Sequence, residues 1–299
     1  MSAVLTSFVL TFVAVQHYRD FEKKCRDVLA QHGIAVKDLI ILADGKALDA
    51  IVAVNGGLAK TVIDAMRAAL AADIFVQDAG AVRRKRLLLA DMDSTMVEEE
   101  TLDEVAAHAG LKDKISAITA RSMRGEIDFR QSVRERVGML RGLSVQALHD
   151  TAARMRYMVG SDVLIRTMRA HGAHCVLVSG GFTFFTGIVA AHLGFDEHFG
   201  NVLHIEGDSL TGTVAEPIQD KSYKRALLLD TAARIGVDLV DTVAVGDGAN
   251  DLEMLSAAGL GVGYYPKPLL RDAIDNYVLH GDLTALLYAQ GYTEQDISF

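Results

Sequence analysis

The segment that most constrains the fold of this chain runs from Arg86 to Thr95 and reads Arg-Leu-Leu-Leu-Ala-Asp-Met-Asp-Ser-Thr. Its apolar part, Leu87 to Ala90, is typical of a fully buried strand in a parallel sheet. The strand ends in two carboxylates, Asp91 and Asp93. Because ligands bind at the carboxyl ends of the strands in open α/β sheets, these acids predict a site there. The alternative is a pair of acids that cap a following helix.

A second apolar run, His174 to Val178, ends in Ser179-Gly-Gly181. This ending offers a hydroxyl and exposed backbone N–H groups, which suit a phosphate. A simple tight turn is the alternative. Further along, residues 201–214 read as a hairpin and residues 221–235 as a helix, with Lys224 near the start of that helix. A lysine in such a position is usually a surface charge and by itself indicates little.

A third apolar run, Thr242 to Val245, leads into Gly246-Asp-Gly-Ala-Asn-Asp251. If a helix begins between Asp247 and Asp251, both carboxylates approach the same point. Carboxylate oxygens in this number are the ligands that Mg²⁺ selects. A calcium loop is a weak alternative, because the full ligand series of such a loop is absent.

Composition and charge narrow the class of protein. The chain has 299 residues, half of them hydrophobic, which is enough for one large domain and one smaller domain. The net charge is -9 and the basic residues are scattered outside Arg83 to Arg86, so no nucleic-acid partner is expected. Cys25 and Cys175 lie in apolar patterns, which indicates buried free thiols and a reducing compartment. No apolar run reaches membrane-spanning length and no signal peptide is indicated, so we expect a cytoplasmic protein without a membrane partner.

The first 80 residues predict a small unit of their own. The expected strands and helices are, in order, a strand at 7–15, a helix at 20–32, a hairpin of 39–43 and 48–54, a helix at 58–71 and a strand at 73–77. This βαββαβ order is that of a ferredoxin-like unit. The unit resembles an ACT domain, a regulatory binder of small amino acids. A dimerisation or packing module without a ligand is an equal alternative, because fold alone does not give function.

A block of helices separates the first site strand from the second. The helical segments are expected at 101–109, 112–121, 128–140 and 145–155. Their place between two strands predicts an insertion over the site, at about residues 97–160. The acids Glu98, Glu99 and Glu100 read as a solvated first helical turn. Arg134 and Arg136 read as exposed helix charges.

Taken together, the segments at the strand ends resemble the ordered motifs of the haloacid dehalogenase-like phosphatases. These segments are Asp91-Met-Asp-Ser-Thr95, Ser179-Gly-Gly181, Lys224 and Gly246-Asp-Gly-Ala-Asn-Asp251. Residues 97–104, 125–129 and 132–137 resemble phosphoserine phosphatases in particular, and the fit extends over about 86–290. One departure is Met92, where many members have phenylalanine, which should affect packing and not chemistry.

The resemblance implies a fold and a division into domains. Residues 86–299 would form an α/β domain with a doubly wound, mostly parallel sheet and a helical cap inserted at about 97–160. Residues 1–80 would form an ACT-like, ferredoxin-like domain in front of it.

The resemblance also implies catalytic roles. Asp91 would attack phosphorus to form an aspartyl-phosphate. Asp93 would protonate the leaving oxygen and then activate water. Mg²⁺ would be held by the carboxylates of Asp91 and Asp247 and the backbone carbonyl of Asp93, with Asp251 nearby.

Substrate contacts follow from the same resemblance. Ser179, the Gly180 N–H and Lys224 would bind the phosphoryl oxygens, and Asn250 would orient Lys224 or the phosphate. In the cap, Glu100 would bind the ammonium of phosphoserine and Arg136 its carboxylate, since the guanidinium fork matches a carboxylate. The apolar residues Met123 and Phe129 would close over the substrate.

The implied activity is Mg²⁺-dependent hydrolysis of O-phospho-L-serine to L-serine and phosphate, the last step of serine biosynthesis. The N-terminal unit would serve as a homodimer contact or as a site for an amino-acid effector. Two alternatives remain: transfer to another alcohol or hydrolysis of another small phosphomonoester, and a catalytically idle amino-acid sensor. The intact set of chemical positions argues against the sensor.

Overall fold

The computed structural model describes residues 5–123 and 126–298, and a six-stranded parallel sheet forms its centre. The strands are, in spatial order, β12 (Tyr277–Val278), β11 (Leu260–Tyr264), β10 (Thr242–Gly246), β5 (Leu87–Asp91), β6 (His174–Phe182) and β7 (Glu197–Asn201). All neighbouring pairs are parallel. The predicted parallel sheet is therefore confirmed, and its first site strand, β5, is central.

Helices cover both faces of this sheet. Leu87 and Leu89 pack on the face covered by α9 (Lys221–Ile235) and α10 (Leu252–Ala257). Leu88 and Ala90 pack on the opposite face, with α7 (Ser161–Ala170), α8 (Thr183–Leu193) and α12 (Ala285–Ala289). All four side chains are fully buried. A strand buried on both sides is continuously apolar, which explains the run before Asp91.

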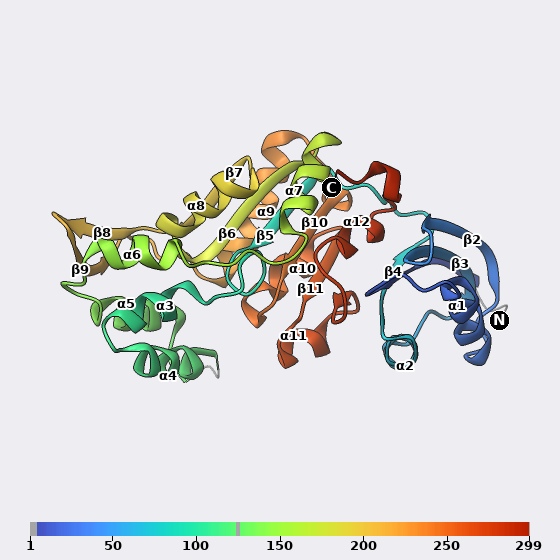
Figure 1. Cartoon of the computed structure of the whole chain (residues 1–299), viewed down its shortest axis with the longest axis horizontal. Coiled ribbons are helices and arrows are strands. Elements are labelled where there is room, and N and C mark those ends of the chain that lie inside the picture. Colours follow the sequence, from blue (N-terminus) through green and yellow to red (C-terminus); the bar gives the residue numbers. More distant parts are fainter. Residues whose placement is uncertain (1–4, 124–125, 299) are drawn as a thin grey trace.

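The insertion between β5 and α7 consists of helices, as the sequence predicts. They are α3 (Thr101–His108), α4 (Lys112–Met123), α5 (Phe129–Gly138) and α6 (Val145–Ala152). The side chains of Asp128 and Ser144 cap α5 and α6 by accepting backbone N–H bonds, which fixes where these helices begin. A hairpin of β8 (Leu203–Glu206) and β9 (Ser209–Val214) lies beside α5. The insertion lies at one end of the molecule, at the left in Figure 1.

The N-terminal part is a four-stranded antiparallel sheet with two helices, at the opposite end in Figure 1. Its elements are β1 (Leu5–Ala14), α1 (Phe21–Gln31), β2 (Val36–Ala43), β3 (Ala47–Asn55), α2 (Lys60–Leu70) and β4 (Ala72–Asp78). One face of this sheet forms a core with α1 and α2. Residues of the other face, including Val13 and Phe75, belong to the same core as α12. The middle of the sheet is thus covered on both faces, whereas the edge strand β2 leaves Ile40 and Ile41 exposed.

Some expectations need correction. Ser179-Gly-Gly181 is not a tight turn: it continues β6, which extends to Phe182. Asn201 ends β7 of the large sheet and does not begin the hairpin, which starts at Leu203. The buried free thiols expected at Cys25 and Cys175 are confirmed. Within the described residues, no helix combines the length and the hydropathy needed to cross a bilayer.

Candidate active site

The register of the parallel sheet brings the predicted site segments to one edge. Asp91 at the end of β5 pairs with Val178 of β6, so Ser179 lies one residue beyond it. Ala90 pairs with Val245 of β10, so Asp247 follows that strand at the same level as the end of β5. Three segments that are far apart in the sequence therefore meet at the carboxyl ends of adjacent strands.

A buried lysine joins two of the predicted carboxylates. Lys224, near the start of α9, donates to Asp91 Oδ1 and to Asp251 Oδ1, both at 2.6 Å. Lys224 is 3% exposed, so it is not the surface charge that its local sequence suggests. Oxygens of Asp91, Asp247 and Asp251 all lie within 4.8 Å of one another. The structure thus forms a compact cluster of three buried carboxylates.

Positive charge in this cluster does not balance the negative charge. Burial and the charge of Asp251 raise the pKa of Asp91 well above its usual range, although Lys224 opposes the shift. Burial raises the pKa of Asp247 to about 6, against the opposing effect of the Lys267 charge. Burial alone would lower the pKa of the Lys224 ammonium, but Asp251 and Asp91 raise it overall. An additional positive charge placed beside these carboxylates would favour their ionised forms.

The cluster suits a hard divalent cation. Carboxylate oxygens at this spacing are the donors that Mg²⁺ takes in proteins. Asp91 and Asp247 are buried, and burial raises the pKa of both carboxyl groups. Both oxygens of Asp251 are already engaged, because Oδ1 accepts from Lys224 and Oδ2 accepts the N–H groups of Asp247 and Gly248 at 3.1 and 3.0 Å. Asp251 therefore organises the loop and the lysine beside Asp91 and Asp247.

The glycines of this loop allow its tight geometry. A Cβ on Gly246 would lie 2.4 Å from Cγ of Asp251, and a Cβ on Gly248 would lie 2.3 Å from Oδ1 of Asn250. Hydrogen bonds hold the Asp251 side chain in place, so only glycine fits at 246, whereas the Asn250 amide would have to turn away from a Cβ at 248. The Asn250 amide is 3.4 Å from Asp251 Oδ1, a long contact that leaves the amide largely available.

Asp93, the second acid, occupies a different environment. Its Oδ1 accepts hydrogen bonds from the backbone N–H and hydroxyl of Thr101, at 2.8 and 2.7 Å. Its Oδ2 accepts from the Ser179 hydroxyl at 2.8 Å. Burial and the charge of Glu100 raise the pKa of Asp93. Asp91 and Asp93 thus differ in their partners, since Lys224 donates to Asp91 and not to Asp93.

Ser179 and Gly180 lie where the second site strand meets the insertion. The Ser179 hydroxyl accepts the Gly181 N–H at 2.8 Å as it donates to Asp93. The ring of Phe129, at the start of α5, lies 3.3 Å from where a Cβ on Gly180 would be. Phe129 thus lies against Gly180 from the insertion side.

Arg136 differs from its neighbour Arg134 on α5. The exposed Arg134 forms an ion pair with Glu216 at 2.7 Å. The half-buried Arg136 donates to Thr119 Oγ1 at 3.1 Å and to the Ser132 carbonyl at 3.3 Å. Among residues 5–123 and 126–298, no carboxylate lies within ion-pair distance of Arg136. Burial lowers the pKa of its guanidinium, against the opposing charges of Asp103, Glu100 and Asp93. A buried guanidinium without a carboxylate partner suits an anionic ligand.

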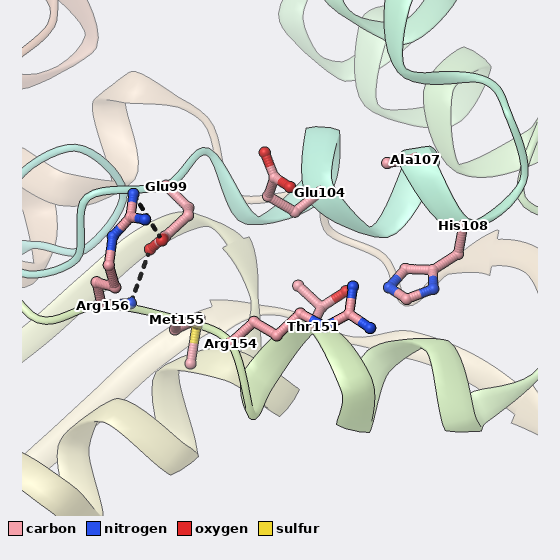
Figure 2. Close-up of a pocket in the computed structure, with 8 residues that line it drawn as sticks. All are labelled: Glu99, Glu104, Ala107, His108, Thr151, Arg154, Met155 and Arg156. Atoms are coloured by element: carbon pink, nitrogen blue, oxygen red, sulfur yellow. Dashed lines mark hydrogen bonds and ion pairs between the residues drawn. The ribbon is translucent and has the colours of Figure 1, made fainter.

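The three consecutive acids before α3 have different roles, and the single solvated turn expected for them is wrong. Glu98 and Glu99 form ion pairs with Arg156, at 2.5 and 3.5 Å. Figure 2 shows the Arg156 guanidinium turned toward Glu99. Glu100 instead accepts from the Ser94 hydroxyl at 3.2 Å and from Lys267 at 3.3 Å. The ion pairs of Glu98 and Glu99 with Arg156 fix the segment before α3, and this segment carries Glu100.

The pocket in Figure 2, of about 340 Å³, is not this site. It lies between α3 and α6 and is lined by Glu99, Glu104, Ala107, His108, Thr151, Arg154, Met155 and Arg156. None of the predicted site residues lines it.

Two residues of the site are missing from the sequence-based set, and one predicted residue is described by its backbone alone. Thr101 binds Asp93 as described, and Lys267 forms an ion pair with Asp247 at 3.0 Å. The signal for Lys267 is a fourth apolar run, 260–264, with a basic residue shortly after it. Met123 ends α4, but its side chain lies outside the described residues.

The fold and this edge of the sheet define a class of protein. Residues 88–256 match the haloacid dehalogenase-like hydrolases, and the chain belongs to this family. A phosphoserine phosphatase of Streptomyces coelicolor is 43% identical over 239 residues, which is 80% of this chain and 58% of the relative. The chain spans between 55% and 59% of the length of the first curated relatives that it matches.

Two solved structures extend the comparison. A haloacid dehalogenase family hydrolase from Salmonella enterica serovar Typhi is similar over 95% of this chain and 98% of its own, with a TM-score of 0.83 and 28% identity. A phospho-aspartyl intermediate analogue of phosphoserine phosphatase covers 71% of this chain and 100% of its own, with a TM-score of 0.64 and 35% identity.

Proposed function

We propose that this chain is a Mg²⁺-dependent phosphoserine phosphatase that hydrolyses O-phospho-L-serine to L-serine and phosphate. The observation that carries the proposal is the meeting of Asp91, Lys224 and Asp247 at the sheet edge. It is joined by Arg136 in the cap, which has no carboxylate partner among the described residues. Phosphoryl transfer needs an in-line nucleophile and positive charge around the transferring group, and this arrangement offers both. The similarity to phosphoserine phosphatases supports the substrate.

In the first step, a carboxylate oxygen of Asp91 attacks phosphorus and the bond from phosphorus to the serine oxygen breaks. Lys224 binds Asp91 and lies where it would also neutralise phosphoryl charge. Asp93 gives its proton to the departing serine oxygen. Its raised pKa favours the protonated acid that this step needs.

In the second step, Asp93 takes a proton from water and the resulting hydroxide attacks the phosphorus of the aspartyl-phosphate. The bond from Asp91 to phosphorus breaks, phosphate leaves, and Asp91 is restored as a carboxylate. Thr101 and Ser179 keep the Asp93 carboxylate in place through both steps. Ser179 and the Gly180 N–H would bind phosphoryl oxygens, with Asn250 orienting the phosphate or Lys224.

The carboxylates of Asp91 and Asp247 and the backbone carbonyl of Asp93 would hold Mg²⁺, with Asp251 beside it. When bound, the cation supplies charge that stabilises the phosphoryl oxygens and the ionised form of Asp91. The three carboxylates of the cluster share the two ammonium groups of Lys224 and Lys267, which leaves an excess of negative charge that supports this choice.

Specificity for an amino-acid ester would come from the cap. Arg136 would bind the substrate carboxylate through its guanidinium fork, and Glu100 would bind the ammonium. Met123 and Phe129 would exclude water until serine has left. The position of Phe129 over Gly180 supports this role.

The N-terminal unit, residues 1–80, is proposed as an ACT-like, ferredoxin-like domain in front of a catalytic domain of 86–299 with a cap at about 97–160. The observed βαββαβ order and the sheet order β2-β3-β1-β4 support this division. A homodimer contact and a site for an amino-acid effector stay predictions for this unit.

The test is phosphate release from O-phospho-L-serine by the wild type and by Asp91→Asn, with and without Mg²⁺. We expect activity only with Mg²⁺ and only in the wild type, because the amide cannot act as the nucleophile. Circular dichroism would verify that the variant is folded. Substantial turnover by a folded Asp91→Asn would show that another group attacks phosphorus.

A further inference from the structure

Lys267 connects the two halves of the site. It lies just beyond the carboxyl end of β11, the strand next to β10 in the sheet. Its ammonium is 3.0 Å from Asp247 Oδ2 on the core side and 3.3 Å from Glu100 Oε1 on the cap side. Among the described residues, no other lysine or arginine forms ion pairs both with an acid of the three-carboxylate cluster and with one of the three acids that precede α3.

The backbone holds Lys267 in this place. Tyr265, two residues earlier, adopts a left-handed conformation with φ +42° and donates its N–H to the Val278 carbonyl at 2.9 Å. Pro266 and Pro268 flank Lys267, and Pro268 begins α11 (Pro268–Ala273). The Lys267 N–H donates to the Asp247 carbonyl at 2.8 Å. A left-handed residue between fixed neighbours is strained, and such strain is maintained mainly at functional sites.

The contact with Lys267 leaves one oxygen of Glu100 available. Glu100 Oε1 accepts from both Lys267 and the Ser94 hydroxyl. For the part of the chain that the structure describes, Oε2 has no hydrogen-bond donor. The Glu100 side chain is 43% exposed, so without these two donors it would sample several rotamers. The donors therefore orient a carboxylate oxygen for a ligand.

We infer that Lys267 is a positioning residue that orients Glu100 so that its free oxygen receives the ammonium of the substrate. This inference rests on the proposed phosphoserine phosphatase activity and adds a specificity-determining residue to it. Lys267 binds Glu100 while anchored to Asp247, so the ammonium subsite of the cap takes its position from the catalytic core.

The charge and the positioning effect of Lys267 can be separated by choice of substrate. Its positive charge attracts the phosphate of any phosphomonoester. Its effect through Glu100 matters only for a substrate with an ammonium. The matched pair is O-phospho-L-serine and 3-phosphooxypropionate, which is the same molecule without the amino group.

The test compares the wild type, Lys267→Met and Lys267→Arg on both substrates, with melting temperatures to verify folding. We expect Lys267→Met to raise KM for O-phospho-L-serine about tenfold or more, the size of one hydrogen bond to a charged group. The KM for 3-phosphooxypropionate should change far less, and Lys267→Arg should restore part of the loss. In a Glu100→Gln background, Lys267→Met should have little further effect, because the residue acts through Glu100.

The inference would be overturned if Lys267→Met impaired hydrolysis of both substrates equally. It would also be overturned if Lys267→Met had its full effect in the Glu100→Gln background. Lys267 would then act only through its charge near the phosphate. An unchanged KM in Lys267→Met would overturn it as well. In either case the wild type still hydrolyses O-phospho-L-serine. A wild type that does not hydrolyse this substrate would instead refute the proposed function, and the inference with it.

Discussion

Replacing Arg136 by alanine tests how the cap recognises its substrate, and Arg134 provides a matched control on the same helix. Arg136 is half-buried and has no carboxylate partner among the described residues, whereas Arg134 is exposed and paired with Glu216. Under the proposed function, Arg136 binds the carboxylate of phosphoserine. We therefore expect Arg136→Ala to impair phosphoserine hydrolysis and Arg134→Ala to leave it nearly unchanged.

The size of the effect follows from the burial of Arg136. Loss of one partner of a buried, hydrogen-bonded charge pair costs about 2–4 kcal/mol, which corresponds to about 30- to 900-fold in kcat/KM. The exposed Arg134 pair is screened by solvent, so its loss should leave kcat/KM nearly unchanged. Arg136→Lys keeps the charge but loses the fork, so an intermediate loss is expected.

The assay is phosphate release from O-phospho-L-serine and from an aryl phosphate, which has no carboxylate. Arg136→Ala should lose much more activity on the first substrate than on the second. Because Arg136 also donates to Thr119 and to the Ser132 carbonyl, melting temperatures must show that the cap remains folded. Equal losses on both substrates in a folded variant would refute substrate recognition by Arg136 and assign it a structural role.

Two further predictions concern the cation and the start of α9. Mg²⁺ should raise the melting temperature of the wild type, because a ligand that binds only the native state stabilises that state, by about 2.7 kcal/mol at a hundred times its Kd. Asp247→Asn should abolish this shift. An equal shift in that variant would contradict binding of Mg²⁺ by the three-carboxylate cluster. Asp220 caps α9, where the Ser222 hydroxyl and N–H and Arg130 lower its pKa against the opposing effect of burial. Its ionised form therefore stabilises the native state above the unfolded pKa of about 3.9, and this stability is lost as the pH falls through the lower folded pKa. Asp220→Asn should lower the melting temperature at pH 7, with a difference that shrinks below about pH 4; a difference independent of pH would contradict this assignment.

Much of the sheet and the core of the site could be predicted from local patterns. An apolar run that ends in acids marks the end of a buried strand, and Asp91 and Asp247 lie there in the structure. The helices of the insertion were predicted because their apolar spacing is local. Their ends differ by a few residues: α6 ends at Ala152, whereas the pattern continues to Met155.

The exposure of individual charges could not be predicted in the same way. Lys224 and Arg136 both resemble surface charges in their local sequence, yet one is buried between carboxylates and the other is half-buried without a carboxylate partner among the described residues. Lys267 is 167 residues from Glu100 in the sequence, so no local pattern connects them. The same applies to Glu98 and Glu99, whose partner Arg156 follows the last of the four insertion helices.

The amino-acid sequence alone therefore determined which strands are buried, where they end and which chemical groups stand at those ends. These properties depend on hydrophobic periodicity and on residues that are neighbours in the chain. The tertiary structure decided which of the charges meet, which oxygens remain free and that the middle of the N-terminal sheet is covered on both faces. Ion pairs and burial depend on distances between segments that folding brings together, and Coulomb energies change with those distances and with exclusion of water.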